Sequence, residues 1–228
     1  MTTISCHLPE PRRGVTAWWP LATIALLLCA GDFFVRLTYT GRAINHTPPW
    51  SWLVATAEST LPTLFTVVVT FVAGLGFWHA EPHRGAAWRV TGAFFCYLAI
   101  DDLLCLHERL GGWLEPWVGD HGAYVWICTL GPVFAITGLV CGWRLLRDLA
   151  TEPARRACLF VAFAALAVAL GFEAFESAAL DSTVRLRGMR LVEWNQWVEE
   201  SLEVLAPVLL VAAAWTQPPH GQFAGAVR

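Results

Sequence analysis

Six apolar segments, each long enough to cross a lipid bilayer, follow one another along the chain. They cover residues 18–37, 51–78, 87–110, 123–146, 157–180 and 191–215. A helix of about 20 apolar residues crosses the roughly 30 Å of hydrocarbon in a bilayer. Because helices satisfy their own backbone hydrogen bonds in lipid, this pattern predicts an all-α fold, an integral membrane bundle of six transmembrane helices.

The composition agrees with a membrane environment. Of the 228 residues, 56% are hydrophobic and 14% are charged, and the mean hydropathy is +0.51. Such a chain is too apolar for a water-soluble domain of this size. We expect a polar leader at residues 1–16, one membrane domain at 17–216 and a flexible tail at 217–228. The lipid bilayer is the expected partner and nucleic acid is not, while the sequence indicates no particular protein partner.

Aromatic and basic residues mark the ends of the segments. Eight tryptophans lie at segment ends, as in an interfacial aromatic belt: Trp18, Trp19, Trp50, Trp52, Trp78, Trp88, Trp143 and Trp215. Six spans place both termini on one side, and nine arginines fall on that side against six on the other. Since cytoplasmic loops carry an excess of basic residues, this asymmetry predicts cytoplasmic termini.

Acidic residues inside the apolar segments gather on one side of the predicted membrane. They lie late in the first, third and fifth segments and early in the second and sixth: Asp32, Glu58, Asp101, Asp102, Glu108, Glu173, Glu176 and the run from Glu193 to Glu203. Because successive spans run in opposite directions, these positions meet in one half of the bilayer. The sequence therefore predicts a one-sided cavity of carboxylates.

Helical phase places several of these residues on shared faces. Glu173 and Glu176 are three residues apart, as are Glu200 and Glu203, so each pair lies on one side of its helix. In a continuous third helix, Asp101 and Glu108 would be nearly eclipsed, with His107 and Asp102 on opposite sides of them.

The cost of these charges favours a bound cation or protons. A charged side chain near the centre of a transmembrane helix costs about 2.5–3.5 kcal/mol, so seven would cost on the order of 20 kcal/mol. The arginines on that side are too few to neutralise them all. Ionisable groups in such positions usually serve function.

We therefore predict a site for one or two divalent metal ions. Its expected ligands are Glu58, Asp101, His107, Glu173, Glu176, Glu200 and Glu203. A carboxylate-rich set with a single imidazole suits iron or manganese better than structural zinc, although the identity stays open among iron, manganese and zinc. In a hydrolytic version acting on a lipid or other hydrophobic substrate, Glu108 or Glu200 would be the general base toward water activated by the metal.

Two other classes of function fit the same residues, so the sequence leaves open whether the protein is an enzyme. The acids could carry protons or cations in a coupled transporter, but that needs polar residues continuing to the other surface. Spans four to six offer little there beyond Thr137. Alternatively, the protein is a non-catalytic scaffold or assembly subunit of a membrane complex, in which the polar cluster holds six helices in register.

Two motifs resemble those of a known group. At Asp101-Asp102-x4-His107-Glu108 and Glu199-Glu200-x-x-Glu203 the chain resembles bacterial multi-span membrane proteins of uncharacterised function, which typically show an acidic pair, His-Glu after four further residues, and Glu-Glu-x-x-Glu in a late helix. The resemblance implies a common site and a multi-pass protein of the bacterial cytoplasmic (inner) membrane. The likeness to alkaline-ceramidase-like membrane hydrolases is superficial, since those use several intramembrane histidines and this chain has one.

Overall fold

The computed structural model describes residues 18–38, 50–55, 60–80, 85–118, 128–179, 185–186 and 189–215. The predicted leader, the predicted tail and Glu58 lie outside these ranges. The described part contains seven α-helices: α1 (Trp19–Thr38), α2 (Leu61–His79), α3 (Ala86–Leu104), α4 (Leu106–Val118), α6 (Gly131–Asp148), α7 (Pro153–Ala179) and α8 (Leu191–Trp215). A 3₁₀ helix, η2 (Trp50–Leu53), and two short strands, β1 (Arg185–Leu186) and β2 (Met189–Arg190), complete it.

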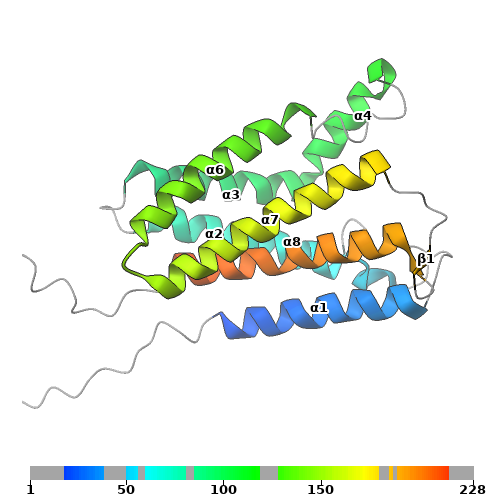
Figure 1. Cartoon of the computed structure of the whole chain (residues 1–228), viewed down its shortest axis with the longest axis horizontal. Coiled ribbons are helices and arrows are strands. Elements are labelled where there is room, and N and C mark those ends of the chain that lie inside the picture. The colour runs from blue at the N-terminus through cyan, green and yellow to red at the C-terminus, as the bar shows by residue number, and fades with distance from the viewer. Residues whose placement is uncertain are drawn as a thin grey trace, which may run out of the picture.

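Helix α8 forms the centre of the bundle. It packs against α7, α2 and α1, while α3 packs on α2, and α6 contacts both α3 and α7. These helices run side by side along the long axis of the molecule, whereas α4 leaves the bundle at an angle (Figure 1). The second half of α8 is almost completely buried from Val204 to Ala213. The apolar run that looked like an ordinary membrane span therefore lies inside the protein.

Helices α2 and α3 approach closely because glycines face each other between them. A Cβ atom added at Gly92 would lie 2.5 Å from the backbone nitrogen of Trp78 and 2.7 Å from the carbonyl oxygen of Gly74. Real Cβ atoms do not come this close to backbone, so both helices rely on the missing side chain at this crossing. Next to it, Phe77, Trp88 and Phe95 form a buried aromatic cluster.

Three helical segments are long and apolar enough to cross a membrane: Trp19–Thr38, Leu61–His79 and Pro153–Phe175. They indicate a membrane protein. The outer surface of the bundle agrees, since large apolar side chains are exposed on several helices, such as Leu27 of α1, Ile136 and Leu139 of α6 and Phe160 of α7.

The helix boundaries depart from prediction in the second to fifth segments, the fifth of which begins four residues early, as α7 at Pro153. The second helix starts at Leu61, where Pro62 occupies its first turn and favours initiation. The third predicted helix, 87–110, breaks at Cys105, and the predicted loop at 111–122 is helical as far as Val118. The fourth helix, expected over 123–146, runs as α6 from Gly131 to Asp148. The sixth coincides with prediction.

The connector before α8 forms a small hairpin that fixes the start of this helix. Arg185 pairs with Arg190 in the antiparallel ladder. Glu193, in the first turn of α8, accepts hydrogen bonds from the backbone nitrogen and the Nε of Arg190, both at 2.9 Å. An acidic side chain at this position also interacts favourably with the helix dipole.

Candidate metal site

A cavity of about 670 Å³ lies among α2, α3, α4, α6, α7 and α8. Six carboxylates line it: Asp101, Asp102, Glu173, Glu199, Glu200 and Glu203. His107 and Arg109 of α4 line it as well, and Val67, Phe95 and Leu166 provide apolar wall. The cavity thus combines an acidic part with an apolar part, and its volume is typical of small-molecule sites.

The break between α3 and α4 shapes the acidic part. Cys105 has φ 49° and ψ 45°, the left-handed helical conformation, which is uncommon for a residue with a side chain. Its backbone N–H donates to the carbonyl oxygens of Asp101 and Asp102, which ends α3, and α4 begins at the next residue. Residues held in such conformations cluster at functional sites.

The break brings His107 to Asp101. The imidazole Nδ1 lies 2.7 Å from Oδ2 of Asp101. In a continuous helix, residues six apart would be displaced by about 9 Å along the axis and point to different sides. The contact therefore exists only because α3 ends at Cys105.

The second carboxylate oxygen of Asp101 accepts no hydrogen bond from the described residues. Asp101 is 2% exposed, and its Oδ1 is a buried atom with no hydrogen-bond partner among the described residues. A buried, unsatisfied carboxylate oxygen is costly. Donor atoms of Asp101, Asp102 and His107 all lie within 4.8 Å of one another. One oxygen of Asp101 therefore contacts the imidazole in this structure, while the other is available to a cation.

The glutamates of α8 add negative charge next to this group. Glu203 lies within electrostatic range of Glu200, Asp102 and Glu173. Arg36 is the largest opposing charge acting on Glu200. Since like charges at close quarters in a low dielectric repel strongly, this arrangement favours a bound cation or protons.

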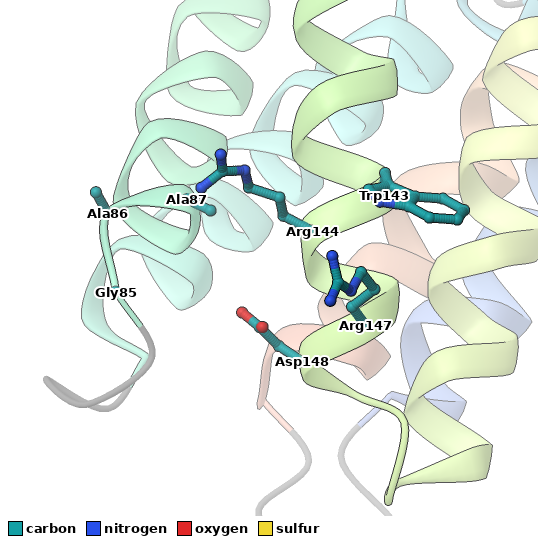
Figure 2. Close-up of a pocket in the computed structure, with 7 residues that line it drawn as sticks. All are labelled: Gly85, Ala86, Ala87, Trp143, Arg144, Arg147 and Asp148. Carbon is teal, nitrogen blue, oxygen red and sulfur yellow. The ribbon is translucent and has the colours of Figure 1, made fainter.

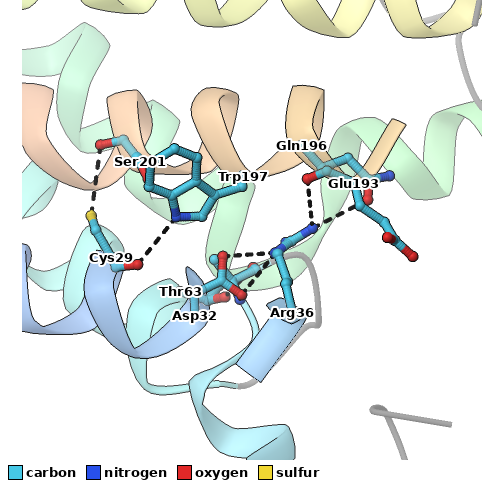
Figure 3. A network of polar contacts seen from close by, with 9 residues as sticks. Cys29, Asp32, Arg36, Thr63, Glu193, Gln196, Trp197 and Ser201 are labelled. Carbon is cyan, nitrogen blue, oxygen red and sulfur yellow. Dashed lines mark hydrogen bonds and ion pairs between the residues drawn. The ribbon is translucent and has the colours of Figure 1, made fainter. Parts of the chain in front are cut away.

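A polar network connects α1 to the start of α8 beside the cavity (Figure 3). The Nε of Arg36 lies 3.0 Å from both carboxylate oxygens of Asp32. Its Nη1 reaches the carbonyl oxygen of Glu193 at 3.4 Å and Oε1 of Gln196 at 3.5 Å. Nearby, Trp197 Nε1 donates to the carbonyl oxygen of Cys29. Arg36 is 5% exposed, so its charge is buried with its partners.

Comparison with known families gives a match over most of the chain. The model of a domain of unknown function, DUF8692, matches residues 21–217. The chain belongs to this family. No curated protein and no solved structure matches it. The expected kinship with proteins of uncharacterised function is confirmed at the level of this family, whose description names no activity.

The structure of this DUF8692 domain brings together five of the predicted ligands: Asp101, His107, Glu173, Glu200 and Glu203 all line the cavity. The backbones of Glu108 and Glu176 lie in α4 and α7, but their side chains fall outside the described part. The metal-binding and catalytic roles assigned to these residues remain predictions.

Sequence reasoning left Asp102 out of the predicted ligand set. A continuous helix would turn Asp102 and His107 to opposite sides of Asp101, whereas the break places all three together. The signal that could have found it is the acidic pair itself, because adjacent carboxylates inside an apolar segment are costly unless both are used.

A second cavity, of about 610 Å³, opens at the other end of the DUF8692 bundle (Figure 2). It lies where the end of α6 meets the start of α3, and its lining includes Trp143, Arg144, Arg147 and Asp148. Asp148 accepts a hydrogen bond of 2.9 Å from Trp88 Nε1, which ties the two helices together. The lining combines opposite charges in a small region.

Proposed function

We propose that this DUF8692 protein is a six-span membrane protein that binds a divalent metal ion through Asp101, Asp102 and His107. We further propose that the metal centre acts on a lipid or other hydrophobic substrate. The remaining predicted ligands of the cavity, Glu173, Glu200 and Glu203, would contribute to the same centre or to a second ion.

The observation that carries this proposal is the state of Asp101. Its Oδ2 contacts the imidazole of His107, and its buried Oδ1 has no hydrogen-bond partner among the described residues, with the Tyr97 side chain as a further neighbour of this carboxylate. A cation bound by Oδ1 and a carboxylate oxygen of Asp102 would satisfy that atom and offset the charge of its neighbours. The imidazole could join them through Nδ1, by exchanging its contact with Oδ2 of Asp101 for the cation. Imidazole and carboxylate together suit iron, manganese or zinc.

The helices beyond the three most apolar ones, namely α3, α6 and α8, also support the proposal of six spans. The 19 residues of α3 extend about 28 Å, close to the thickness of the hydrocarbon. Helix α6 exposes a face of large apolar side chains that includes Val133, Ile136 and Leu139. What separates α3 and α8 from the more apolar helices is the acidic residues that line the cavity.

The apolar part of the cavity supports a hydrophobic substrate. Phe95, Phe134 and Leu166 line the same cavity as the acidic donors. An amphiphile could place its polar group at the metal and its chain against these side chains. In a hydrolytic reaction the metal would supply Lewis acidity, and Glu200, or Glu108 as also predicted, would accept a proton from water.

Elemental analysis of the purified protein tests the proposal. Wild type should contain a stoichiometric divalent metal or bind Mn²⁺ saturably, and Asp101→Asn and Asp102→Asn should each abolish this, because an amide is a much weaker ligand than a carboxylate. Asp148→Asn is the matched control: it makes the same change at the other end of the bundle and should retain metal. Glu200→Gln tests whether α8 also contributes a ligand.

Two outcomes would contradict this function. Wild type that neither contains metal nor binds Mn²⁺ would rule out the metal centre. If, in addition, Asp101→Asn and Glu200→Gln fold normally but lose a pH-dependent activity, the proton-coupled transporter is the better interpretation. Normal function in every variant would favour the scaffold.

A further inference from the structure

Helix α4 carries an apolar stripe on a face that points away from the bundle. Leu106, Leu110, Trp113 and Trp117 recur at spacings of four, three and four residues, so they lie along one side of the helix. Trp113 is 71% exposed and Trp117 is 82% exposed. These are unusually open positions for the two largest side chains of a helix.

A different face of α4 points to the cavity. His107 is partly buried and lines the cavity, and Gly111, one turn further on, is buried. Among the elements of the described fold, α3 is the one that α4 contacts most. The orientation of His107 therefore depends on how α4 is held relative to α3, across the single left-handed residue Cys105.

The depth of α4 identifies what lies against the stripe. Helix α3 is about as long as the hydrocarbon is thick, so Leu104 reaches the boundary of the apolar layer if α3 spans it. Helix α4 starts there, and in Figure 1 it departs sideways from the bundle axis. Leu103 of α3 and Leu106 of α4, on the two sides of Cys105, are both exposed. The stripe thus continues the lipid-facing surface of α3 into the headgroup region.

We propose that α4 is an interfacial helix whose stripe lies in the lipid–water interface of the surrounding bilayer. Tryptophan favours this interface, and amphipathic helices with aromatic and leucine side chains on one face bind there. The seating of α4, meaning the contact of its apolar stripe with the bilayer, holds the imidazole of His107 against Asp101. The seating rests on the proposed span of α3 but not on the metal site, whereas its effect on His107 rests on both.

Hydrogen–deuterium exchange on the full-length protein tests the seating. The protein is placed in phosphatidylcholine nanodiscs with one copy per disc, without metal, and exchange is followed in peptides covering residues 106–118. The double variant Trp113→Glu/Trp117→Glu should exchange at least about tenfold faster in α4 than wild type, because charge is expelled from the apolar interface. Gly112→Glu is the matched control. It adds charge on another face, where no atom lies within 4 Å of the new Cβ, and should exchange like wild type.

Mn²⁺ binding in the same nanodiscs tests the effect on His107. The double variant should bind Mn²⁺ about tenfold or more weakly than wild type, the usual size of an effect on ligand orientation, and Gly112→Glu should bind normally. Faster exchange in α4 with unchanged Mn²⁺ affinity would overturn this part of the inference.

The remaining outcomes are equally decisive. Equal exchange in wild type and the double variant would overturn the interfacial helix, and protection seen only in discs with two copies would assign the stripe to a second copy of the chain instead. If wild type binds no Mn²⁺, the proposed function and the role of seating for His107 both fail, while the exchange data still decide whether α4 lies on the bilayer.

Discussion

Asp101 and His107 are in contact at 2.7 Å although they belong to two different helices. The two helices are separated by one residue, Cys105, in the left-handed conformation. If the same segment formed one continuous helix, the carboxylate and the imidazole would point to different sides of it. The geometry of the candidate metal site is therefore a property of the backbone at Cys105 as much as of its donors.

Substitutions at Cys105 should differ in stability and metal binding according to how well the new residue tolerates positive φ. Cys105→Gly should keep the stability and the metal binding of wild type, because glycine adopts this conformation without steric cost. Cys105→Val should lose about 1–3 kcal/mol and bind metal more weakly, since a β-branched residue resists it. Unfolding in mixed SDS micelles and Mn²⁺ titration measure the two effects. Equal behaviour of the two variants would show that the break is not what positions His107.

The buried ion pair of Asp32 and Arg36 should behave as a unit. Arg36→Met should destabilise the protein by about 3–5 kcal/mol, because it leaves the Asp32 carboxylate buried without its cation. The double variant Asp32→Asn/Arg36→Met should recover much of this loss, as no charge is then stranded. A double-mutant cycle in SDS unfolding measures the coupling, and strictly additive losses would contradict this account.

Alanine substitutions at two helical glycines should have opposite effects. Gly92→Ala should cost about 1–3 kcal/mol or more, since its Cβ would collide with the backbone of α2. Gly171→Ala, in the exposed part of α7 with no atom within 4 Å of the added Cβ, should gain up to about 1 kcal/mol. Unfolding transitions of the two variants provide the measurement. A neutral Gly92→Ala would show that α2 and α3 can separate at no cost.

The arginine asymmetry leads to a prediction of topology. Both termini should face the cytoplasm, so a C-terminal fluorescent-protein fusion should be bright and a C-terminal alkaline phosphatase fusion inactive. The opposite pattern would reverse the orientation and open the acidic cavity toward the cytoplasm.

Much of the helical layout could be predicted from hydrophobicity alone. The last helix coincides with residues 191–215, and the first is displaced by one residue at each end, 18–37 against Trp19–Thr38. The gathering of Asp101, Glu173 and Glu200 around one cavity followed from alternating helix direction. These features depend on hydrophobic patterns that extend over whole spans, and such patterns can be recognised in a sequence.

The break at Cys105 could not be predicted, because no local signal marks it. Neither glycine nor proline occurs from Leu98 to Arg109, and the apolar run continues across the junction. Conversely, Gly111, Gly112 and Pro116 suggested a loop where the chain forms α4. Helical phase therefore paired Asp101 with Glu108, whereas the structure pairs it with His107.

Because α3 ends and α4 begins at Cys105, the relative orientation of Asp101 and His107 depends on the number of residues between them. One residue inserted between Cys105 and His107 would turn the imidazole by about 100° around the axis of α4, away from both aspartates. An insertion beyond Trp117 would leave the donors where they are. The number of residues across this corner, more than their identity, thus decides whether the three side chains lie together.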